Sequence, residues 1–301
     1  MREEQSKTLP QVSGRAITLN GRLSRALSRL PLHLVVIGLT LLWSIPTLGL
    51  FISSFRPARE IAVTGWWTVL TGQASLNLEL YRQALTQAGM AQSFFNSLVI
   101  TIPATVIPIM IAAFAAYAFA WLNFPGRQVL FVLVIGLLVV PLQMTFIPIL
   151  RLYNRLGLTG EFSALWLAHA GYGLPFAIYL LRNFIGGLPR DLFESAFLDG
   201  ASSFDVFFRI VIPLSVPALS SLVIFQFMWV WNDLLVALIY VGGTRDVAPM
   251  TVTIGNLVNS LGGNWQVLTA AAFISMLLPM IVFFSLQRYF VRGILAGSVK
   301  G

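Results

Sequence analysis

Residues 94–122 read FFNSLVITIPATVIPIMIAAFAAYAFAWL, an apolar run without a single acidic, basic or imidazole side chain. A helix needs about 20 such residues to cross about 30 Å of hydrocarbon, where lipid offers no partner for a free backbone N–H or C=O. The run therefore predicts a membrane-spanning helix. Five further runs of similar length predict an all-α polytopic membrane protein with six transmembrane helices: His33–Phe55, Val129–Leu150, Ser163–Leu181, Leu214–Tyr240 and Val267–Phe290.

The composition of the whole chain fits a bilayer as its main solvent, so membrane lipid is the first expected partner. Of the 301 residues, 57% are hydrophobic and 10% are charged, whereas soluble domains carry about 25% charged residues. The alternation of apolar and polar residues that is typical of a transmembrane β-barrel is missing. The chain contains no cysteine, which excludes disulfides and thiolate metal sites, and we expect no metal site.

The basic residues indicate which side of the membrane each segment occupies. Six spans place both termini on one side, and most of the 19 Lys and Arg residues lie there. The exceptions are Arg56, Arg59, Arg82, Arg151, Arg155 and Arg245. The positive-inside rule then predicts that both termini are cytoplasmic. The net charge of +8 does not predict nucleic-acid binding, because no basic stripe with interleaved aromatic residues accompanies it.

These assignments divide the chain into a cytoplasmic basic segment (1–32), a first transmembrane helix (33–55), an external loop (56–93), a five-helix core (94–292) and a cytoplasmic tail (293–301). The core includes a long cytoplasmic loop at 183–213. The N-terminal region resembles a signal peptide in charge, but its apolar part of about 20 residues exceeds the usual 7–15. We therefore expect the first helix to be retained.

The cytoplasmic loop has the pattern of a short amphipathic helix, a sharp turn and a second helix. Pro189 suits the first turn of a helix, and Asp191 suits the positive end of its dipole. Gly200 can supply the left-handed residue that ends a helix, and Ser202 with Asp205 resembles a capping box. The apolar face carries Leu192, Phe193, Ala196 and Phe197.

This amphipathic helix could have either of two kinds of partner, a lipid surface or another protein. It could lie on the lipid surface, as many amphipathic helices do. Its acidic side chains argue against that, because an anionic inner leaflet would repel them. They are Asp191, Glu194, Asp199 and Asp205. An acidic amphipathic helix in the cytoplasm fits a protein partner better.

The loop resembles the "EAA" loop of ABC-importer permeases, whose pattern is Glu-Ala-Ala, three residues, Gly, nine residues, Ile-x-Leu-Pro. Glu194-Ser195-Ala196, Gly200 and Ile210-Val211-Ile212-Pro213 match that spacing throughout. The departures are Ser195 for the first Ala and Ile212 for Leu. The resemblance implies a type I ABC-importer permease fold, in which residues 189–213 dock an ATPase. The docking residues would be Asp191, Phe193, Glu194, Ser195, Ala196, Asp199, Gly200, Phe204, Ile210 and Pro213.

The segment Arg56-Pro57-Ala58-Arg59-Glu60-Ile61 with Gly65-Trp66-Trp67 looks most like α-glucoside permeases. Further segments resemble the carbohydrate-uptake branch of the family, in particular the smaller of the two maltose permease subunits. Ser53-Ser54-Phe55-Arg56-Pro57, Ala116-Tyr117-Ala118-Phe119-Ala120 and Trp231-Asn232-Asp233 are such segments. The closing residues Gly297-Ser298-Val299-Lys300-Gly301 resemble a tail that contacts the ATPase. By that resemblance Gly297, Ser298, Lys300 and Gly301 are expected ATPase contacts. The alternative for this segment is a frayed polar terminus.

The resemblance also implies the surroundings of the chain. It predicts multi-pass insertion in a bacterial plasma (inner) membrane and a subunit of an ATP-driven sugar importer. The partners would be a dimer of ATP-hydrolysing subunits, a second, homologous permease subunit, an extracytoplasmic solute-binding protein and a sugar substrate. No cofactor is expected in this chain, because the partner ATPase would bind ATP and Mg²⁺.

Three polar residues within the spans are candidates for the translocation pathway or a gate. A carboxylate in a span is costly and suggests a function. Asp233 is therefore either an outer-gate or subunit contact or a plain interfacial cap, and the same alternatives hold for Asn232. His169 either packs with its hydrogen bonds satisfied or lines a cavity.

Other functions find little support in the sequence. An enzyme needs a nucleophile and base or paired metal ligands, and the two histidines with no cysteine supply neither. No phosphate-binding Gly-x-x-x-x-Gly-Lys-Ser/Thr motif is present, so the chain is not expected to be the ATPase. An ion-coupled secondary transporter is the alternative function. It would usually show more intramembrane charges and an internal repeat.

Overall fold

The computed structural model describes residues 19–257 and 265–298, and the side chains within 30–257 and 265–287. The chain divides into two units, residues 1–50 and 51–301. Every regular element in the described ranges is helical. The expected all-α membrane fold is therefore confirmed.

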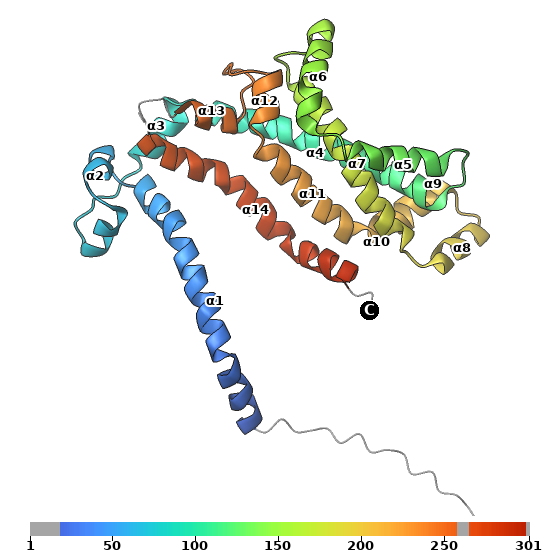
Figure 1. Cartoon of the computed structure of the whole chain (residues 1–301), viewed down its shortest axis with the longest axis horizontal. Helices are drawn as coiled ribbons and strands as arrows, with labels where there is room; N and C mark the ends of the chain where they lie inside the picture. The colour runs from blue at the N-terminus through green and yellow to red at the C-terminus, as the bar shows by residue number, and fades with distance from the viewer. Residues whose placement is uncertain (1–18, 258–264, 299–301) are drawn as a thin grey trace, which may run out of the picture. The chain divides into compact units, whose positions relative to one another are not determined.

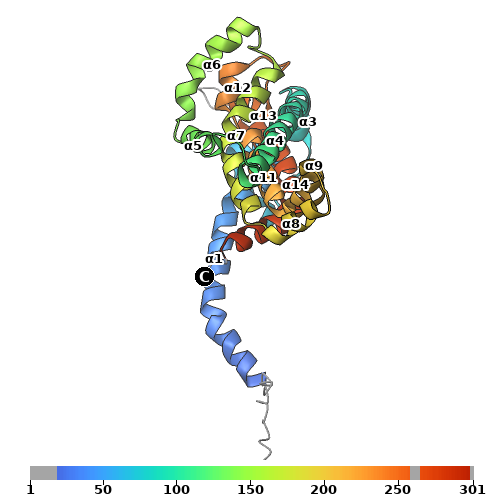
Figure 2. The ribbon, with the colours of Figure 1, turned by 90° about the vertical axis from the view of Figure 1, so that its right-hand side faces the viewer.

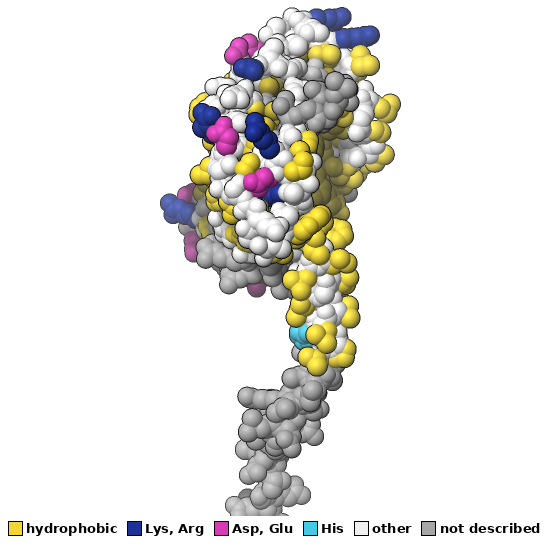
Figure 3. Space-filling view, turned by 90° about the vertical axis from the view of Figure 1, so that its left-hand side faces the viewer, with side chains coloured by type: hydrophobic (Ala, Val, Ile, Leu, Met, Phe, Trp, Pro, Cys, Tyr) yellow, Lys and Arg dark blue, Asp and Glu magenta, His cyan; other side chains and the backbone are white. Residues whose placement is uncertain are grey.

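The first unit consists of α1 (Leu19–Ser54) as far as Leu50. Its apolar side chains are exposed on all sides, with Trp43 at 86% and Leu42 at 65% of their full exposure. Figure 3 shows these apolar side chains along the described part of the helix. A helix that is apolar all round needs lipid or protein around it. Residues 30–54 are long and apolar enough to cross a membrane, as expected for the first span.

Within its described residues, the second unit continues with fifteen further helices, η1 and η2 included (Figure 1). In order along the chain they are α2 (Ala58–Val63), η1 (Trp66–Thr71), α3 (Glu79–Thr86), α4 (Met90–Trp121), α5 (Arg127–Leu137), α6 (Leu142–Leu156), α7 (Phe162–Gly186), α8 (Arg190–Leu198), α9 (Ser203–Val206), η2 (Phe207–Val211), α10 (Ile212–Leu214), α11 (Val216–Trp231), α12 (Leu235–Tyr240), α13 (Met250–Leu257) and α14 (Trp265–Ser298).

Four of the six expected spans are single helices that are long and apolar enough to cross a membrane: those in α1, α4, α7 and α14. The other two are broken, so the chain has up to six spans if each bent pair counts as one. The expected span Val129–Leu150 bends by 99° between α5 and α6. Pro141 stands at this break, and a proline disfavours helical conformation in the residue before it.

The expected fifth span, Leu214–Tyr240, is not one helix either. Residues 203–214 meet α11 at an angle of 72°. At its other end α11 stops at Trp231, and a separate short helix, α12, begins at Leu235. Asp233 therefore lies in a break between two helices and not inside a continuous span.

The centre of the second unit is a close pairing of α4 and α7, which lie side by side in Figures 1 and 2. α11 packs on α4 and on α14. The contact surfaces of α4 and α7 are rich in small residues, which allow helix backbones to approach closely in a membrane. Fully or almost fully buried examples are Ala104, Ala112, Ala116 and Ala177.

Buried polar side chains tie these helices together. The Gln226 amide on α11 donates to the carbonyl oxygens of Ala104 on α4 (3.1 Å) and His169 on α7 (3.3 Å). Gly173 leaves the space that this amide occupies, since a Cβ there would lie 2.5 Å from Gln226 Oε1. In a low-dielectric interior such hydrogen bonds are costly to leave unmade. They fix the register of three helices at one point.

Candidate functional site

The loop at residues 183–213, which the sequence predicts to be cytoplasmic, folds into the expected helix, turn and second helix. Pro189 precedes α8 with φ of −59° and ψ of 130°, and Asp191 lies in the first turn. Gly200 has φ of +83°, a left-handed conformation that strains any residue with a Cβ. The turn is closed by a hydrogen bond of 2.9 Å from the Ala201 N–H to the Ala196 carbonyl. The chain therefore reverses sharply between α8 and α9.

The second helix starts with the expected capping box. The Asp205 N–H donates to Ser202 Oγ (3.2 Å), and the Ser202 N–H donates to Asp205 Oδ2 (3.2 Å). The Ser202 hydroxyl also donates to the same carboxylate (2.5 Å), and this hydrogen bond holds the pKa of Asp205 below its usual value. Ionised Asp205 thus stabilises the start of α9.

α8 is anchored to the transmembrane helices through one buried aromatic residue. Phe193 is 1% exposed and stacks on the Trp121 ring at the end of α4, with centroids 3.7 Å apart and planes at 14°. Trp121 in turn donates its indole N–H to the Ile185 carbonyl near the end of α7 (3.0 Å). These two contacts connect α8 to the ends of both central helices.

The second arm of the loop is also packed on α4. Phe207 is buried and stacks on Phe114, with centroids 4.4 Å apart and planes at 20°. It begins η2, which is a π-helix of five residues. Such wide turns inside helices are frequent at functional sites. Two aromatic contacts, about two turns apart along α4, thus hold the whole loop.

The outward surface of the loop combines exposed apolar side chains with carboxylates. Leu198 is 88% exposed and Phe204 is 70% exposed, although both are large and apolar. Exposed Asp191, Glu194 and Asp199 lie on the same short segment. A polar hollow at the turn is lined by Asp199, Gly200, Asp205, Arg209 and four smaller or apolar neighbours. We call this surface of residues 190–210 the docking surface.

The structure places the ten expected docking residues in different environments. Phe193 is buried, and Ala196 and Ile210 are partly buried. The exposed ones are Asp191, Glu194, Ser195, Asp199, Gly200, Phe204 and Pro213. Sequence reasoning missed Leu198 as a surface residue and Trp121 as the anchor for Phe193. The available signal for Leu198 was its place directly before Asp199 and Gly200, at the predicted end of the acidic helix.

The polar residues of the broken fifth span form a cluster that the sequence did not predict. His169 Nε2 on α7 lies 3.7 Å from Asp233 Oδ2, and both side chains are at least nine-tenths buried. The Asp233 carboxylate accepts hydrogen bonds from the N–H groups of Val236 (3.3 Å) and Ala237 (3.0 Å), so it caps α12. Asn232 is exposed and donates to the Met228 carbonyl (2.7 Å).

The His169 ring has one unsatisfied atom. It meets the Trp229 ring edge to face at 5.5 Å, and its Nδ1 is buried without a hydrogen-bond partner among the described residues. The expectation of a packing histidine with both nitrogens satisfied is therefore met only in part. No group of three or more potential metal ligands occurs in the described ranges.

The expected tail contacts fall at the end of the described chain. Gly297 and Ser298 belong to the last turn of α14, and their side chains are not described. Lys300 and Gly301 lie outside the described residues, as do residues 1–18 of the basic N-terminal segment.

Comparison with known proteins identifies relatives along most of the chain. Residues 25–296 match the model of the family described as "Binding-protein-dependent transport system inner membrane component". The osmoprotective compounds uptake permease protein GgtD of Synechocystis sp. is 59% identical, with 90% of this chain and 92% of the relative covered. The alpha-glucoside transport system permease protein AglG of Rhizobium meliloti is 44% identical, with 89% and 96% covered.

A solved structure shows the same fold. It is a bacterial ABC transporter involved in the import of the acidic polysaccharide alginate. Its TM-score is 0.73 at 19% sequence identity, with 89% of this chain and 98% of that chain covered. The broken spans and the docking surface described above therefore occur in a chain with the fold of an ABC-importer permease.

Proposed function

Because this chain belongs to the family of inner-membrane components of binding-protein-dependent transport systems, we propose that it is the permease subunit through which an ATPase drives the import of small α-glucosides. A permease subunit is a transport component and not an enzyme. ATP and Mg²⁺ would bind to the separate ATPase, and this chain would need no cofactor of its own. Its other partners would be a second permease subunit and an extracytoplasmic solute-binding protein.

The proposal that the docking surface binds an ATPase rests on one observation. The docking surface presents Leu198 and Phe204 to solvent, while Phe193 on the same loop is stacked on Trp121. Large exposed apolar side chains rimmed by carboxylates are typical of a protein contact and not of an anionic lipid surface. One partner could thus bind the outer face while the inner face passes movement to α4 and α7.

The movement itself would follow the nucleotide state of the ATPase. Closure of an ATPase dimer would draw the two docking surfaces of a permease pair together. Because α8 is fixed to both α4 and α7, this displacement would tilt the central helices and open the pathway outward. ATP hydrolysis would then return the helices and the pathway to their first arrangement. The coupling needs a rigid connection with two arrangements, and the two stacked aromatic pairs supply the connection.

The cargo class rests on the relatives. AglG is named for alpha-glucosides and GgtD for osmoprotective compounds. Small neutral polyhydroxylated molecules fit both descriptions, and α-glucosides are the narrower class. The Asp233–His169 cluster supports a gating role because it joins α7 to the break before α12, where a small rotation would separate the two side chains.

The ATPase assignment is tested with the double substitution Leu198→Ser and Phe204→Ser. Both side chains are exposed, so the fold should persist, while the loss of two apolar contacts at an interface should weaken ATPase binding at least tenfold. The measurement is the affinity of the purified permease pair for the cognate ATPase in detergent.

The matched control is Leu70→Ser in the external loop, where the leucine is 77% exposed. It should leave ATPase binding unchanged. Equal ATPase affinity in the double variant and the control would refute the docking surface. Transport of α-glucosides is tested separately, by uptake into proteoliposomes that hold the complete transporter and its binding protein.

A further inference from the structure

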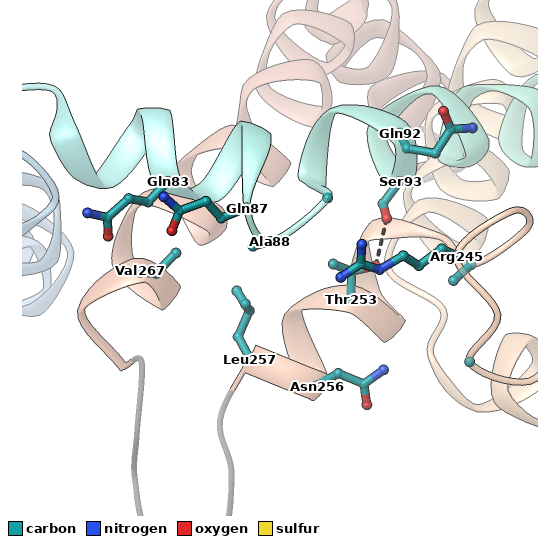
Figure 4. A pocket seen from close by; sticks show the side chains of 13 residues that line it. Gln83, Gln87, Ala88, Gln92, Ser93, Arg245, Thr253, Asn256, Leu257 and Val267 are labelled. Atoms are coloured by element: carbon teal, nitrogen blue, oxygen red, sulfur yellow. Dashed lines mark hydrogen bonds between the residues drawn. The ribbon is translucent and has the colours of Figure 1, made fainter.

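A polar pocket of about 470 Å³ opens at the start of α4 (Figure 4). Its walls come from the end of α3, the first turn of α4, the loop before α13, α13 itself and the start of α14. These stretches are far apart in the sequence and all belong to the second unit. The volume lies within the range of roughly 300–1,000 Å³ that is typical of small-ligand pockets.

The walls are held in place by hydrogen bonds between them. Ser93 Oγ on α4 lies 2.6 Å from Thr253 Oγ1 on α13, which is the dashed contact in Figure 4. The Asn96 amide donates to the carbonyls of Arg245 (3.1 Å) and Ala248 (3.0 Å). Ser97 Oγ accepts the Met250 N–H (2.9 Å). The pocket is therefore preformed, which lowers the entropy that a ligand must overcome on binding.

The side chains around the pocket have unused hydrogen-bonding capacity. Among the described residues, no hydrogen bond or ion pair engages the side chains of Gln87, Arg245 or Asn256. Gln83 uses one amide N–H, toward Glu79 Oε1 (2.9 Å). Gln92 uses one toward Asn96 Oδ1 (3.0 Å). The remaining donors and acceptors are free for a ligand or water.

The chemistry of this lining favours a neutral polyhydroxylated ligand. Amides offer a donor and an acceptor side by side, which suits the vicinal hydroxyls of a saccharide. The described lining contains no carboxylate, so a cation has no anchor, and a single exposed guanidinium is a weak anchor for an anion. Leu257 and Val267 supply apolar contacts for the C–H groups of a sugar ring.

The position along α4 indicates which side of the membrane the pocket faces. The pocket lies at the Met90 end, and the Phe193 anchor lies at Trp121, the other end of this helix of 32 residues. At 1.5 Å per residue the two ends are about 48 Å apart, more than the hydrocarbon thickness. With the docking surface in the cytoplasm, the pocket is extracytoplasmic.

We infer that this pocket binds the cargo itself, a small neutral saccharide or polyol, on the extracytoplasmic side of the permease. The inference rests on the proposed function, which supplies the cargo class and the orientation. It adds a direct contact between this subunit and the cargo before entry into the pathway. Gln87, Asn256 and Arg245 are the side chains that would hold the hydroxyl groups.

The test uses the complete transporter in lipid nanodiscs, without the binding protein. Maltose, sucrose and trehalose, three α-glucosides, are titrated by saturation-transfer-difference NMR, with empty nanodiscs as the blank. The double variant Gln87→Ala and Asn256→Ala should weaken binding about tenfold, since the hydrogen bonds of two side chains to the sugar are lost. Gln73→Ala in the external loop, an exposed glutamine outside the pocket, is the matched control.

Uptake into proteoliposomes with the binding protein is measured in parallel, which separates the possible failures. Binding of a transported sugar that falls in the double variant and not in the control supports the inference. If a sugar is transported but does not bind, or binds equally to the double variant, the inference alone fails. If the variant weakens only the affinity for the loaded binding protein, the pocket serves protein docking instead. If none of the three sugars is transported or bound, the proposed cargo class is wrong as well.

Discussion

At the scale of single residues, Gly173 shows how tightly the helix junction is packed. The Gln226 amide lies where a side chain at this position would be, and it bridges α4 and α7. Gly171, two residues earlier on the same helix, has open space around its missing Cβ. The two glycines therefore offer a direct comparison of a filled and an open position.

We expect Gly173→Ala to destabilise the subunit by about 1–3 kcal/mol, because the added methyl group must displace the buried amide from its hydrogen bonds. Gly171→Ala should be neutral or slightly stabilising. The measurement is the midpoint of thermal unfolding of the purified subunit in detergent. Equal midpoints for the two variants would contradict the packing described here.

At the scale of elements, the proposed function assigns ATPase binding to the outer face of the α8–α9 loop and transmission of movement to the contact between α8 and α4. Leu198 and Phe204 point outward, whereas Phe193 points inward to Trp121. Substitutions on the two faces should therefore have different effects on transport.

We expect Phe193→Ala to retain ATPase binding but to lower the amount of solute imported per ATP hydrolysed. A stacked aromatic pair contributes about 0.5–1.5 kcal/mol beyond its buried area, and its loss loosens the link to α4. Both rates are measured in the same proteoliposomes. Phe193→Leu, which keeps most of the apolar contact, should retain more of the coupling. Loss of ATPase binding in parallel with transport would show that Phe193 serves docking and not transmission.

The positions of the helices were largely predictable, and their breaks were not. Long apolar runs identified the spans in α1, α4, α7 and α14 because burial in lipid depends on composition and length. The 99° bend at Pro141 lies inside a continuous apolar run, and α11 ends at Trp231 inside another predicted span, so composition and length reveal neither break. A proline such as Pro108 lies inside α4 without breaking it, so proline alone does not predict a break.

At the scale of the whole molecule, two exposed leucines can report the orientation of the chain in the membrane. Leu198 on the docking surface and Leu70 in the external loop are both highly exposed, at 88% and 77%. The chain contains no cysteine, so a thiol reagent would label only a cysteine that is introduced by substitution.

We expect Leu198→Cys to react with a membrane-impermeant maleimide only in inside-out vesicles, and Leu70→Cys only in intact spheroplasts. The physical reason is the excess of Lys and Arg on the side of the termini, which favours cytoplasmic retention. Labelling is read by mass shift on a gel. The opposite labelling pattern would show that the chain has the reverse orientation. Labelling of both positions from the same side would contradict an odd number of membrane spans between Leu70 and Leu198.

The docking residues were predictable from sequence only as a pattern. The spacing from Glu194 to Pro213 and the turn at Gly200 follow local rules that a sequence carries directly. The partners of Phe193 and Asp233 do not, because Trp121 and His169 lie more than 60 residues away along the chain. Such pairs arise from the packing of α4, α7 and α11, and a single sequence does not predict which distant residues that packing brings together.

The π-helix at Phe207–Val211 makes this loop sensitive to length as well as to residue type. Each residue of an α-helix turns the chain by about 100°, so a wide turn accommodates one residue more than a regular helix would. Because the wide turn already contains the extra residue, deleting one residue there would leave α9 and Gly200 facing as they do now, whereas inserting one residue in α10 would rotate them by about 100° relative to α11. A one-residue insertion in α10 would therefore turn the docking surface to another direction while every residue of that surface is still present.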